Sequence, residues 1–358
     1  MEGHDCAIVG ASFAGLACAT SLARAGRRVI VLERKADVGE KLHTTGILVK
    51  DAVDRVELLA ALPAHLVRRV EGVRLYAPNL RSVDLAAPGY YFLATDTPNV
   101  LRWLADRAID AGAEIALGTP FIEARRSKRG FELGGGRNAR YLVGADGPTS
   151  RVASTLGLGR NRQFLFGIEH EYAGVDIDAP DRMHCFIDRT LAPGYLGWVV
   201  AGVGLVQVGL ARRERGVGKR APAMDAFLRK IAGHFDFRHA QPVAVRAGRI
   251  PCGGIVDPVA APGVMLVGDA AGMVSPLTAG GIHTALAHGA DAGKAIAAHL
   301  RGECGDPAEW FVERYPRFRA KRMLRWAYDH FQSDTAFNLL LATKAMRDAA
   351  SLVYFHRR

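Results

Sequence analysis

Near its start the chain reads DCAIVGASFAGLACATSLARAGRRVIVLE, at residues 5–33. The apolar run 6–9 predicts a buried parallel strand, and the segment 10–15 predicts a tight turn that leads into a helix of small residues. A second apolar run, 29–32, predicts the next strand and stops at the acidic residue Glu33. We therefore expect a strand, a turn, a helix and a strand in succession, with an acid at the end of the second strand.

Small residues occupy the three positions of this turn where a bound pyrophosphate requires them. Gly10 permits the tight turn, Ser12 leaves room for the backbone to approach a phosphate, and Gly15 permits close packing of the helix on the strand. The N-terminus of the helix favours an anion, and Glu33 lies roughly twenty residues further on, where an acid accepts hydrogen bonds from a ribose 2′-hydroxyl. The pattern predicts dinucleotide binding, and the glutamate argues against the 2′-phosphate of NADP at this turn. A helix packed closely on a sheet, without a ligand, is the alternative.

The composition is that of a globular protein with a large core. The chain has 358 residues, of which 49% are hydrophobic and 23% charged, enough for one or two domains. The first residues lack the charged segment and following apolar stretch of a signal peptide. No run reaches the roughly eighteen apolar residues of a membrane span, so we expect a cytoplasmic protein. Its five cysteines lack C-x-x-C spacing and predict neither a disulfide framework nor a metal site.

The net charge of +11 leaves three interpretations open. A solvated basic surface is the simplest, and anionic substrates or cofactors, or an anionic membrane surface, are the others. Basic residues cluster between positions 314 and 325, which favours peripheral contact with a membrane. Nucleic acid is not expected as a partner, because no stretch combines basic residues with interleaved aromatic ones at a motif spacing.

Short strand-like runs interrupt the nucleotide-binding pattern twice. They begin near residue 71, separated by Pro-Asn and Pro-Gly turns, and they dominate again from 164 to 210. We expect a discontinuous nucleotide-binding domain at 1–70, 95–162 and 249–302, an inserted β-sheet substrate domain at 71–94 and 163–248, and a helical C-terminal region at 303–358.

Two later stretches repeat the arrangement of a strand followed by glycine, aspartate and a helix start. They are GADGPTS at 144–150 and GDAA at 268–271. An aspartate at such a place binds a ribityl or ribose hydroxyl, directly or through water, while the adjacent amide groups face phosphate. For Asp146 an ordinary turn, in which the carboxylate caps nearby backbone, is an equal alternative.

In order and approximate spacing, the three motifs resemble those of the flavoprotein hydroxylase superfamily, which has the fold of p-hydroxybenzoate hydroxylase. Within it, GDAAG at 268–272 and PLTAGGI at 276–282 are similar to the geranylgeranyl reductase family, whereas aromatic hydroxylases show a P-x-x-G-Q-G-x-N pattern there. The segment RIPCGG at 249–254 and the basic helical tail also resemble the reductases. The resemblance covers residues 5–330 and implies an α/β fold, with a Rossmann-type FAD-binding domain, an inserted antiparallel β-sheet substrate domain and a helical C-terminal tail.

The resemblance also implies roles in FAD binding. Gly281 and Ile282, at a helix start, would offer backbone N–H groups to the N1 edge of the isoalloxazine, since a helix N-terminus stabilises the negative charge of reduced flavin. Glu33 would bind the adenosine ribose, and Asp269 would lie by the ribityl chain and the pyrophosphate. The full set is Gly10, Ser12, Phe13, Ala14, Gly15, Glu33, Arg34, Thr44, Asp146, Gly147, Gly268, Asp269, Gly281 and Ile282.

Three departures from the reductase pattern bear on the substrate and the flavin. The segment 43–45, His-Thr-Thr, stands where archaeal and plant reductases often carry an Arg-Cys pair, so no cysteine acts there. Thr97 replaces an arginine at the start of a helix, and the family's Tyr-x-Trp-x-Phe-Pro motif is present in part, as Tyr195 and Trp198. We expect these two residues on a strand at 194–201 and, because they are three apart, on its opposite faces, one in the pocket and one in the core.

No nucleophile, base and acid triad is expected, because a flavin performs hydride chemistry at its own N5. The catalytic residues are therefore unknown, and Tyr195, Trp198 and His283 are the candidates for the pocket. A helix-capping or core role is the alternative for His283, and a core role is the alternative for Trp198.

The first hypothesis is an FAD-dependent reductase that saturates carbon–carbon double bonds of an isoprenoid or other apolar substrate, by hydride transfer from flavin N5, in peripheral contact with an anionic membrane. The alternative is a flavin-dependent monooxygenase, a hydroxylase or epoxidase, of a small aromatic or natural-product substrate. A flavin-bound electron-transfer or binding protein is a third. No second Gly-rich nucleotide motif is present, so NAD(P)H, as the electron donor, would bind transiently at the flavin face.

Overall fold

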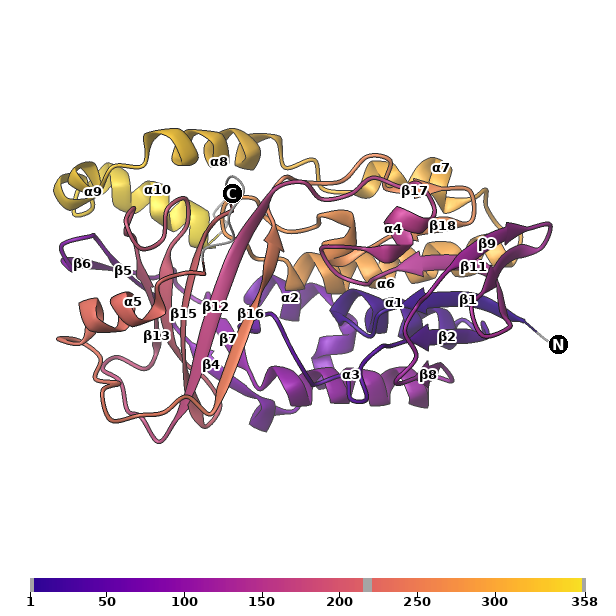
Figure 1. The fold of residues 1–358 in the computed structure, drawn as a ribbon, viewed down its shortest axis with the longest axis horizontal. Helices are drawn as coiled ribbons and strands as arrows, with labels where there is room; N and C mark the ends of the chain where they lie inside the picture. The colour runs from indigo at the N-terminus through magenta and orange to yellow at the C-terminus, as the bar shows by residue number, and fades with distance from the viewer. Residues whose placement is uncertain (1–2, 215–220, 356–358) are drawn as a thin grey trace.

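The computed structural model describes residues 3–214 and 221–355. Two large β-sheets follow one another along the long axis of the molecule, and helices pack on both (Figure 1). The strands of the second sheet come from two separate parts of the sequence. The expected α/β architecture with an inserted sheet is therefore confirmed.

The first sheet is built around the strand of the opening motif. Its order is β17-β18-β11-β1-β2-β8; β1 runs parallel to β2 and β11, and the strand β10 adds to β11 in antiparallel fashion. All of β2 and the last four residues of β1 are buried, as in parallel sheets that are covered on both faces. The strands are β1 (His4–Val9), β2 (Val29–Leu32), β8 (Glu114–Ala116), β9 (Ala124–Ser127), β10 (Gly130–Leu133), β11 (Arg137–Gly144), β17 (Ala260–Ala261) and β18 (Val264–Leu266).

Helices α1 (Phe13–Arg24) and α6 (Ile282–Leu300) cross one another in backbone contact. An added Cβ at Gly289 would lie 2.3 Å from the carbonyl oxygen of Ala14, and one at Gly293 would lie 2.6 Å from that of Cys18. Glycine at these two places of α6 lets the two backbones approach this closely. The contact fixes the middle of α6 against the first turns of α1, although the helices are far apart in the sequence.

The second sheet has seven strands in the order β16-β12-β15-β14-β13-β5-β6. All neighbouring pairs are antiparallel except β5 with β13, which is parallel, so the expected antiparallel sheet has one exception. One face packs on α5 (Met224–Ile231) and the other on the C-terminal helices. The strands are β5 (Gly72–Tyr76), β6 (Ser82–Leu85), β12 (Phe164–Ala173), β13 (Arg182–Phe186), β14 (Gly197–Ala201), β15 (Leu205–Arg213) and β16 (Ala244–Pro251).

A third, small sheet joins β3 (Ile47–Val49), β7 (Phe92–Thr95) and β4 (Val67–Val70), in the antiparallel order β3-β7-β4. Strand β7 begins within the expected insertion at 71–94, yet its partners lie before that insertion. The other two strands of this segment, β5 and β6, belong to the second sheet. The division of the chain into domains stays a prediction.

Helices α8 (Arg319–Phe331), α9 (Asp334–Leu340) and α10 (Lys344–Phe355) lie over the second sheet (Figure 1). The buried Arg325 anchors them, because it donates to the carbonyl of Gly194 and pairs with Asp329. Within residues 3–214 and 221–355, no helix is both long enough and apolar enough to cross a membrane. The remaining helical segments are α2 (Lys50–Arg55), η1 (Glu57–Ala61), η2 (Ala64–Leu66), α3 (Thr97–Asp110), α4 (Arg151–Thr155), η3 (Gly268–Ala271), α7 (Pro307–Trp310) and η4 (Phe311–Arg314).

We expect Gly289→Ala to destabilise the protein by about 1–3 kcal/mol, because the added methyl group meets the backbone of α1. Alanine is the better helix former by about 1 kcal/mol, so without the close contact the change would stabilise the protein. Chemical denaturation of the purified protein measures the difference. Lys294→Ala, at an exposed position of the same helix, is the control and should change stability by less than about 0.5 kcal/mol. An unchanged or raised stability of Gly289→Ala would contradict the close contact.

Candidate functional site

A cavity of about 1560 Å³ extends from the opening motif to the C-terminal helices. Its volume exceeds the roughly 300–1,000 Å³ of a pocket for one drug-sized ligand, so it has room for a dinucleotide and a second molecule. Every residue that the sequence predicts for FAD binding or for the pocket lines this cavity, with the exception of Gly15. The fold thus brings together motifs that are far apart in the chain.

Ser12 replaces the second glycine of the motif by capping the helix. Its hydroxyl accepts a hydrogen bond from the Gly15 N–H at 3.3 Å and donates one to the Ala145 carbonyl at 3.1 Å. Gly10 has a φ of +101°, and a Cβ there would lie 2.5 Å from the same carbonyl oxygen. A Cβ at Gly15 would lie 2.1 Å from the carbonyl oxygen of Gly10, so this glycine serves the packing of the helix on the turn.

Glu33 ties the end of β2 to the first turn. One carboxylate oxygen accepts a hydrogen bond from the Ala11 N–H at 2.9 Å, the other accepts one from the Lys35 N–H at 2.9 Å, and the side chain is buried in the cavity wall. Each oxygen has a further lone pair, so ribose hydroxyls can still donate to this carboxylate. Arg34 and Phe13 line the same end of the cavity.

The carboxylate of Asp146 accepts hydrogen bonds from residues that follow it in the chain. It accepts hydrogen bonds from Ser150 Oγ at 2.6 Å and from the N–H groups of Arg151 and Val152 at 2.6 and 3.1 Å. It therefore caps the start of α4, which is the turn role that the sequence left open for it. Gly147 beside it has a φ of +84° and lines the cavity, and a role of both residues in FAD binding stays a prediction.

Asp269 lines the cavity, and its carboxylate has no hydrogen-bond partner in the described part of the chain. Burial raises the pKa of this carboxyl to about 6. A desolvated carboxylate without partners fits a ligand that is rich in hydroxyl groups, such as the ribityl chain of FAD. Gly268, which precedes it, has a φ of +58° and lines the cavity too.

Helix α6 begins at the cavity with Ile282, after Gly281, and no side chain caps this end. The segment before it is held by Tyr195, whose hydroxyl donates to the Thr278 carbonyl at 2.6 Å. A helix of 19 residues that starts in this way presents the positive end of its dipole to a ligand, which suits the negative edge of reduced flavin. His283, the second residue of the helix, lines the cavity as well.

The strand expected at 194–201 is shorter than predicted. Strand β14 starts at Gly197, and Tyr195 lies in the bend before it. The prediction that Tyr195 and Trp198 point to opposite faces of one strand is therefore wrong, and both residues line the cavity. The physical reason is the turn at Gly194, where a φ of +76° redirects the chain immediately before Tyr195.

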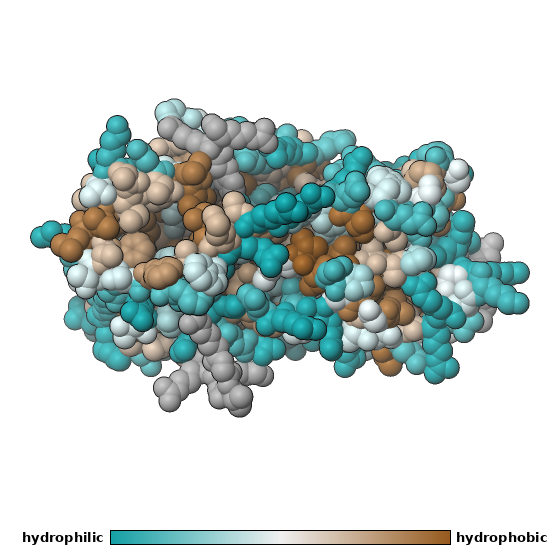
Figure 2. Space-filling view, turned by 90° about the horizontal axis from the view of Figure 1, so that it is seen from above, coloured by the Kyte–Doolittle hydropathy of each residue, from teal (hydrophilic) through white to brown (hydrophobic). Residues whose placement is uncertain are grey.

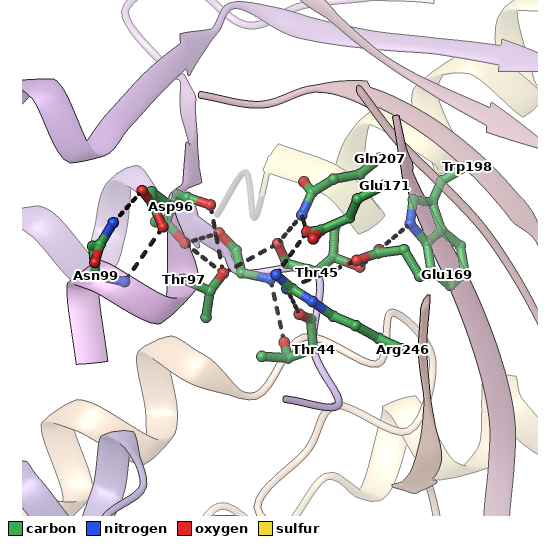
Figure 3. Close-up of polar contacts among 12 residues, drawn as sticks. Thr44, Thr45, Asp96, Thr97, Asn99, Glu169, Glu171, Trp198, Gln207 and Arg246 are labelled. Atoms are coloured by element: carbon green, nitrogen blue, oxygen red, sulfur yellow. Dashed lines mark hydrogen bonds and ion pairs between the residues drawn. The ribbon is translucent and has the colours of Figure 1, made fainter. Parts of the chain in front are cut away.

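A cluster of buried polar side chains, which the sequence motifs do not reveal, lies against the cavity wall (Figure 3). Glu169 and Glu171 are 4% and 5% exposed, and Arg246 reaches them from the neighbouring strand. Arg246 also donates to the carbonyl of Thr44, which lines the cavity. The available signal was the spacing of the two acids, which lie two apart and so share the face of β12 that otherwise carries Leu165, Gly167 and Ala173.

Comparisons with known proteins show the family to which the chain belongs. The chain matches a family model described as an FAD binding domain over residues 4–325. It is 31% identical over 341 residues to digeranylgeranylglycerophospholipid reductase 2 of Methanopyrus kandleri, and the alignment covers 87% of this chain and 81% of the relative.

The fold is also found in solved structures. A geranylgeranyl bacteriochlorophyll reductase-like protein of Thermoplasma acidophilum matches with a TM-score of 0.84 at 20% identity, over 99% of this chain and 96% of the other. p-Nitrophenol 4-monooxygenase of Pseudomonas putida matches with a TM-score of 0.75 at 16% identity, over 99% and 98% of the two chains. With the family match and the archaeal relative, the chain is an FAD-dependent oxidoreductase that belongs to the geranylgeranyl reductase family.

Proposed function

We propose that this oxidoreductase saturates isolated carbon–carbon double bonds in the prenyl chains of a membrane lipid. The observation that carries the proposal is the apolar half of the cavity, which leads from the predicted flavin position to the C-terminal helices. A prenyl chain has no hydrogen-bonding groups and gains from burial in such a space. The name of the archaeal relative supports a prenylated lipid as the substrate. The apolar lining is contributed by Leu324, Ala327, Phe331, Phe337, Leu341, Met346, Ala349, Ala350, Leu352, Val353 and Tyr354.

FAD suits the polar half of the cavity. The first turn would hold its pyrophosphate, Glu33 its adenosine ribose, Asp269 its ribityl hydroxyls and the start of α6 its isoalloxazine. When bound, FAD supplies the two electrons of the reduction at its N5. The residues of the chain orient the double bond against that atom and exclude water from it. NAD(P)H, as the donor of electrons, would enter by the same cavity and leave again, since the sequence has no second Gly-rich nucleotide motif.

The outer side of the C-terminal helices suits a membrane surface. Figure 2 shows apolar side chains gathered around a hollow on this face, at the left end of the molecule. Trp326, Phe331 and Leu339 are 56%, 71% and 72% exposed. The exposed arginines Arg319 and Arg322 lie on α8 and would meet anionic headgroups. On such a surface a lipid would reach the cavity without passing through water.

A flavin-dependent monooxygenase is the second candidate. It is favoured by the segment His-Thr-Thr at 43–45, which stands where reductases often carry an Arg-Cys pair, and by the incomplete motif at Tyr195 and Trp198. The fold shared with p-nitrophenol 4-monooxygenase is compatible with it. The two reactions differ in their use of oxygen, which makes them separable by one experiment.

Loaded with FAD and reduced by dithionite without oxygen, the protein should add two hydrogen atoms to each double bond of digeranylgeranylglycerophospholipid that it reduces. Mass spectrometry of the extracted lipid measures this gain, with heat-inactivated protein as the control. A parallel incubation in ¹⁸O₂ with NADPH tests the second candidate. Incorporation of labelled oxygen into a substrate, without a gain of hydrogen across its double bonds, would contradict the reductase.

FAD affinity should fall as the pH drops through about 6, because protonation of Asp269 removes the charge that accepts the ribityl hydroxyls. Asp269→Asn should weaken binding by about 1.5–3 kcal/mol, the worth of a charged hydrogen bond, and should abolish this pH dependence. Titration of the flavin fluorescence measures both. Glu33→Gln is the matched control, which should bind FAD more weakly while the dependence near pH 6 remains. A pH dependence that survives in Asp269→Asn would exclude Asp269 as its source.

The double variant Trp326→Ser, Leu339→Ser should lose most of its binding to vesicles that contain anionic phosphatidylglycerol. Each large apolar side chain contributes about 1.5–3 kcal/mol when it is fully buried, and both are exposed on the proposed membrane face. Co-sedimentation measures the bound fraction. Ile109→Ser, Ile122→Ser removes two side chains that are 52% and 67% exposed and lie outside the C-terminal helices, and it should bind as the wild type does. Equal losses in the two double variants would argue against a specific face.

A further inference from the structure

A row of residues crosses the second sheet on the face that meets the cavity. Arg246, Glu169, Gly209 and Trp198 stand in register on β16, β12, β15 and β14. A Cβ at Gly209 would lie 2.0 Å from the indole ring of Trp198, so the absent side chain is what gives the ring its place. The indole ring of Trp198 lies over Gly209 of the intervening strand β15. Its N–H can therefore reach β12, where it donates to Glu169 Oε2 at 2.9 Å.

The Glu169 carboxyl is held by two neutral donors. Thr45 Oγ1 donates to Oε2 at 2.5 Å, the same oxygen that Trp198 reaches. The other oxygen, Oε1, is buried without a hydrogen-bond partner in the described part of the chain, and Arg246 Nη1 lies 4.0 Å from it. Thr45 and Trp198 line the cavity, whereas Glu169 does not; its carboxylate lies between these two residues (Figure 3). The indole of Trp198 can only donate, whereas the hydroxyl of Thr45 can both accept and donate a proton, so Thr45 is the group that can link this carboxyl to the cavity.

Glu171, two residues along the same strand, is bound by a cation instead. Its Oε1 accepts from Arg246 Nη2 at 2.6 Å and from Gln207 Nε2 at 3.4 Å. Arg246 gives its Nη1 to the Thr44 carbonyl at 2.8 Å. The guanidinium of Arg246 thus hydrogen-bonds Glu171 and the backbone. Its distance of 4.0 Å from Glu169 is longer than its distance of 2.6 Å from Glu171.

The surroundings of Glu169 favour a neutral carboxyl. Burial is the main cause that raises its pKa, and the charge of Glu171 on its own strand adds to the rise. The hydrogen bonds from Thr45 and Trp198 and the charge of Arg246, on β16, act in the opposite direction. The net rise means that Glu169 keeps its proton to a higher pH than an exposed glutamate does.

We propose that Glu169 is an internal proton donor that serves the double-bond reduction through the hydroxyl of Thr45. The inference rests on the proposed function, because saturation of an alkene consumes one proton for every hydride. Thr45 belongs to the segment 43–45, which carries two hydroxyl groups and no thiol.

When Glu169 is protonated at Oε2, the hydrogen bond between this oxygen and Thr45 Oγ1 reverses, so that Oε2–H donates to Thr45 and the Thr45 O–H can point to the substrate. In the proposed step the Thr45 O–H bond then breaks as a C–H bond forms on one alkene carbon, while the Oε2–H of Glu169 protonates the Thr45 oxygen. The hydride for the other carbon, with both electrons, comes from reduced flavin. Thr45 ends the step as a hydroxyl and Glu169 as a carboxylate, which takes a proton from water before the next turnover. Arg246, 4.0 Å from Oε1, stabilises this carboxylate while it exists.

The first test compares Glu169→Gln with Glu171→Gln in the FAD-loaded protein. The wild-type rate of lipid reduction should fall as the pH rises through the raised pKa of Glu169, because the donor loses its proton. Glu169→Gln should lower kcat about 10²–10⁴-fold and lose this dependence. Glu171→Gln should keep the dependence and shift it to lower pH, because the charge that helps to raise the pKa of Glu169 is gone. Thr45→Val should be slow like Glu169→Gln, and Thr45→Ser should restore the rate.

The second test observes the proton without any substrate. Because burial raises the pKa of Asp269 to about 6, all variants share one protonated-carboxyl component. In addition, an infrared titration of the FAD-loaded protein should show a second component that persists above the ordinary glutamate pKa of about 4.3, in the wild type and Glu171→Gln but not in Glu169→Gln. Retention of this component in Glu169→Gln would overturn the proposal, and so would a wild-type kcat and pH profile in that variant with its FAD spectrum and thermal stability unchanged. A wild type that saturates no prenyl lipid would refute the proposed reaction instead, and the infrared titration would still decide whether Glu169 holds the proton.

Discussion

The backbone contact between α1 and α6 is the constraint on which the site depends. Because the two helices touch without side chains at Gly289 and Gly293, their N-termini cannot shift independently. One N-terminus carries the turn predicted for the pyrophosphate, and the other starts at the predicted place of the isoalloxazine. A dinucleotide bound as proposed would be held at two fixed points, and its reactive ring would face the wall that the second sheet provides.

The opening motif could be interpreted from the sequence because its requirements are local. Gly10 and Gly15 are needed by contacts around a single turn, and Ser12 meets the same geometry by capping the helix. The order of strands and helices along the chain follows from similar short-range patterns, and the family resemblance adds the way in which the segments assemble. A motif does not show which groups its side chains bind by hydrogen bonds in the folded protein. Asp146 caps a helix, for example, whereas Asp269 faces the cavity without a partner in the described structure.

Features that depend on how residues of neighbouring strands align could not be predicted from local sequence patterns. The polar cluster draws Thr45, Glu169, Trp198 and Arg246 from four separate segments, and its geometry exists only once β12 lies between β15 and β16. The place of Tyr195 was mistaken for a related reason. A turn at Gly194 and the anchoring of that turn by Arg325 from a distant helix decide where the strand begins.

The parallel pairing of β5 with β13 has a consequence for the newly made polypeptide. Strand β5 ends at Tyr76, but its neighbour starts at Arg182, and the second sheet has its last strand only when Pro251 has been made. The first sheet is completed later still, because β11 pairs with β18, and β18 is complete only when Leu266 has been made. Most of the chain therefore leaves the ribosome before either sheet is complete, and the open strand edges meanwhile invite wrong pairings.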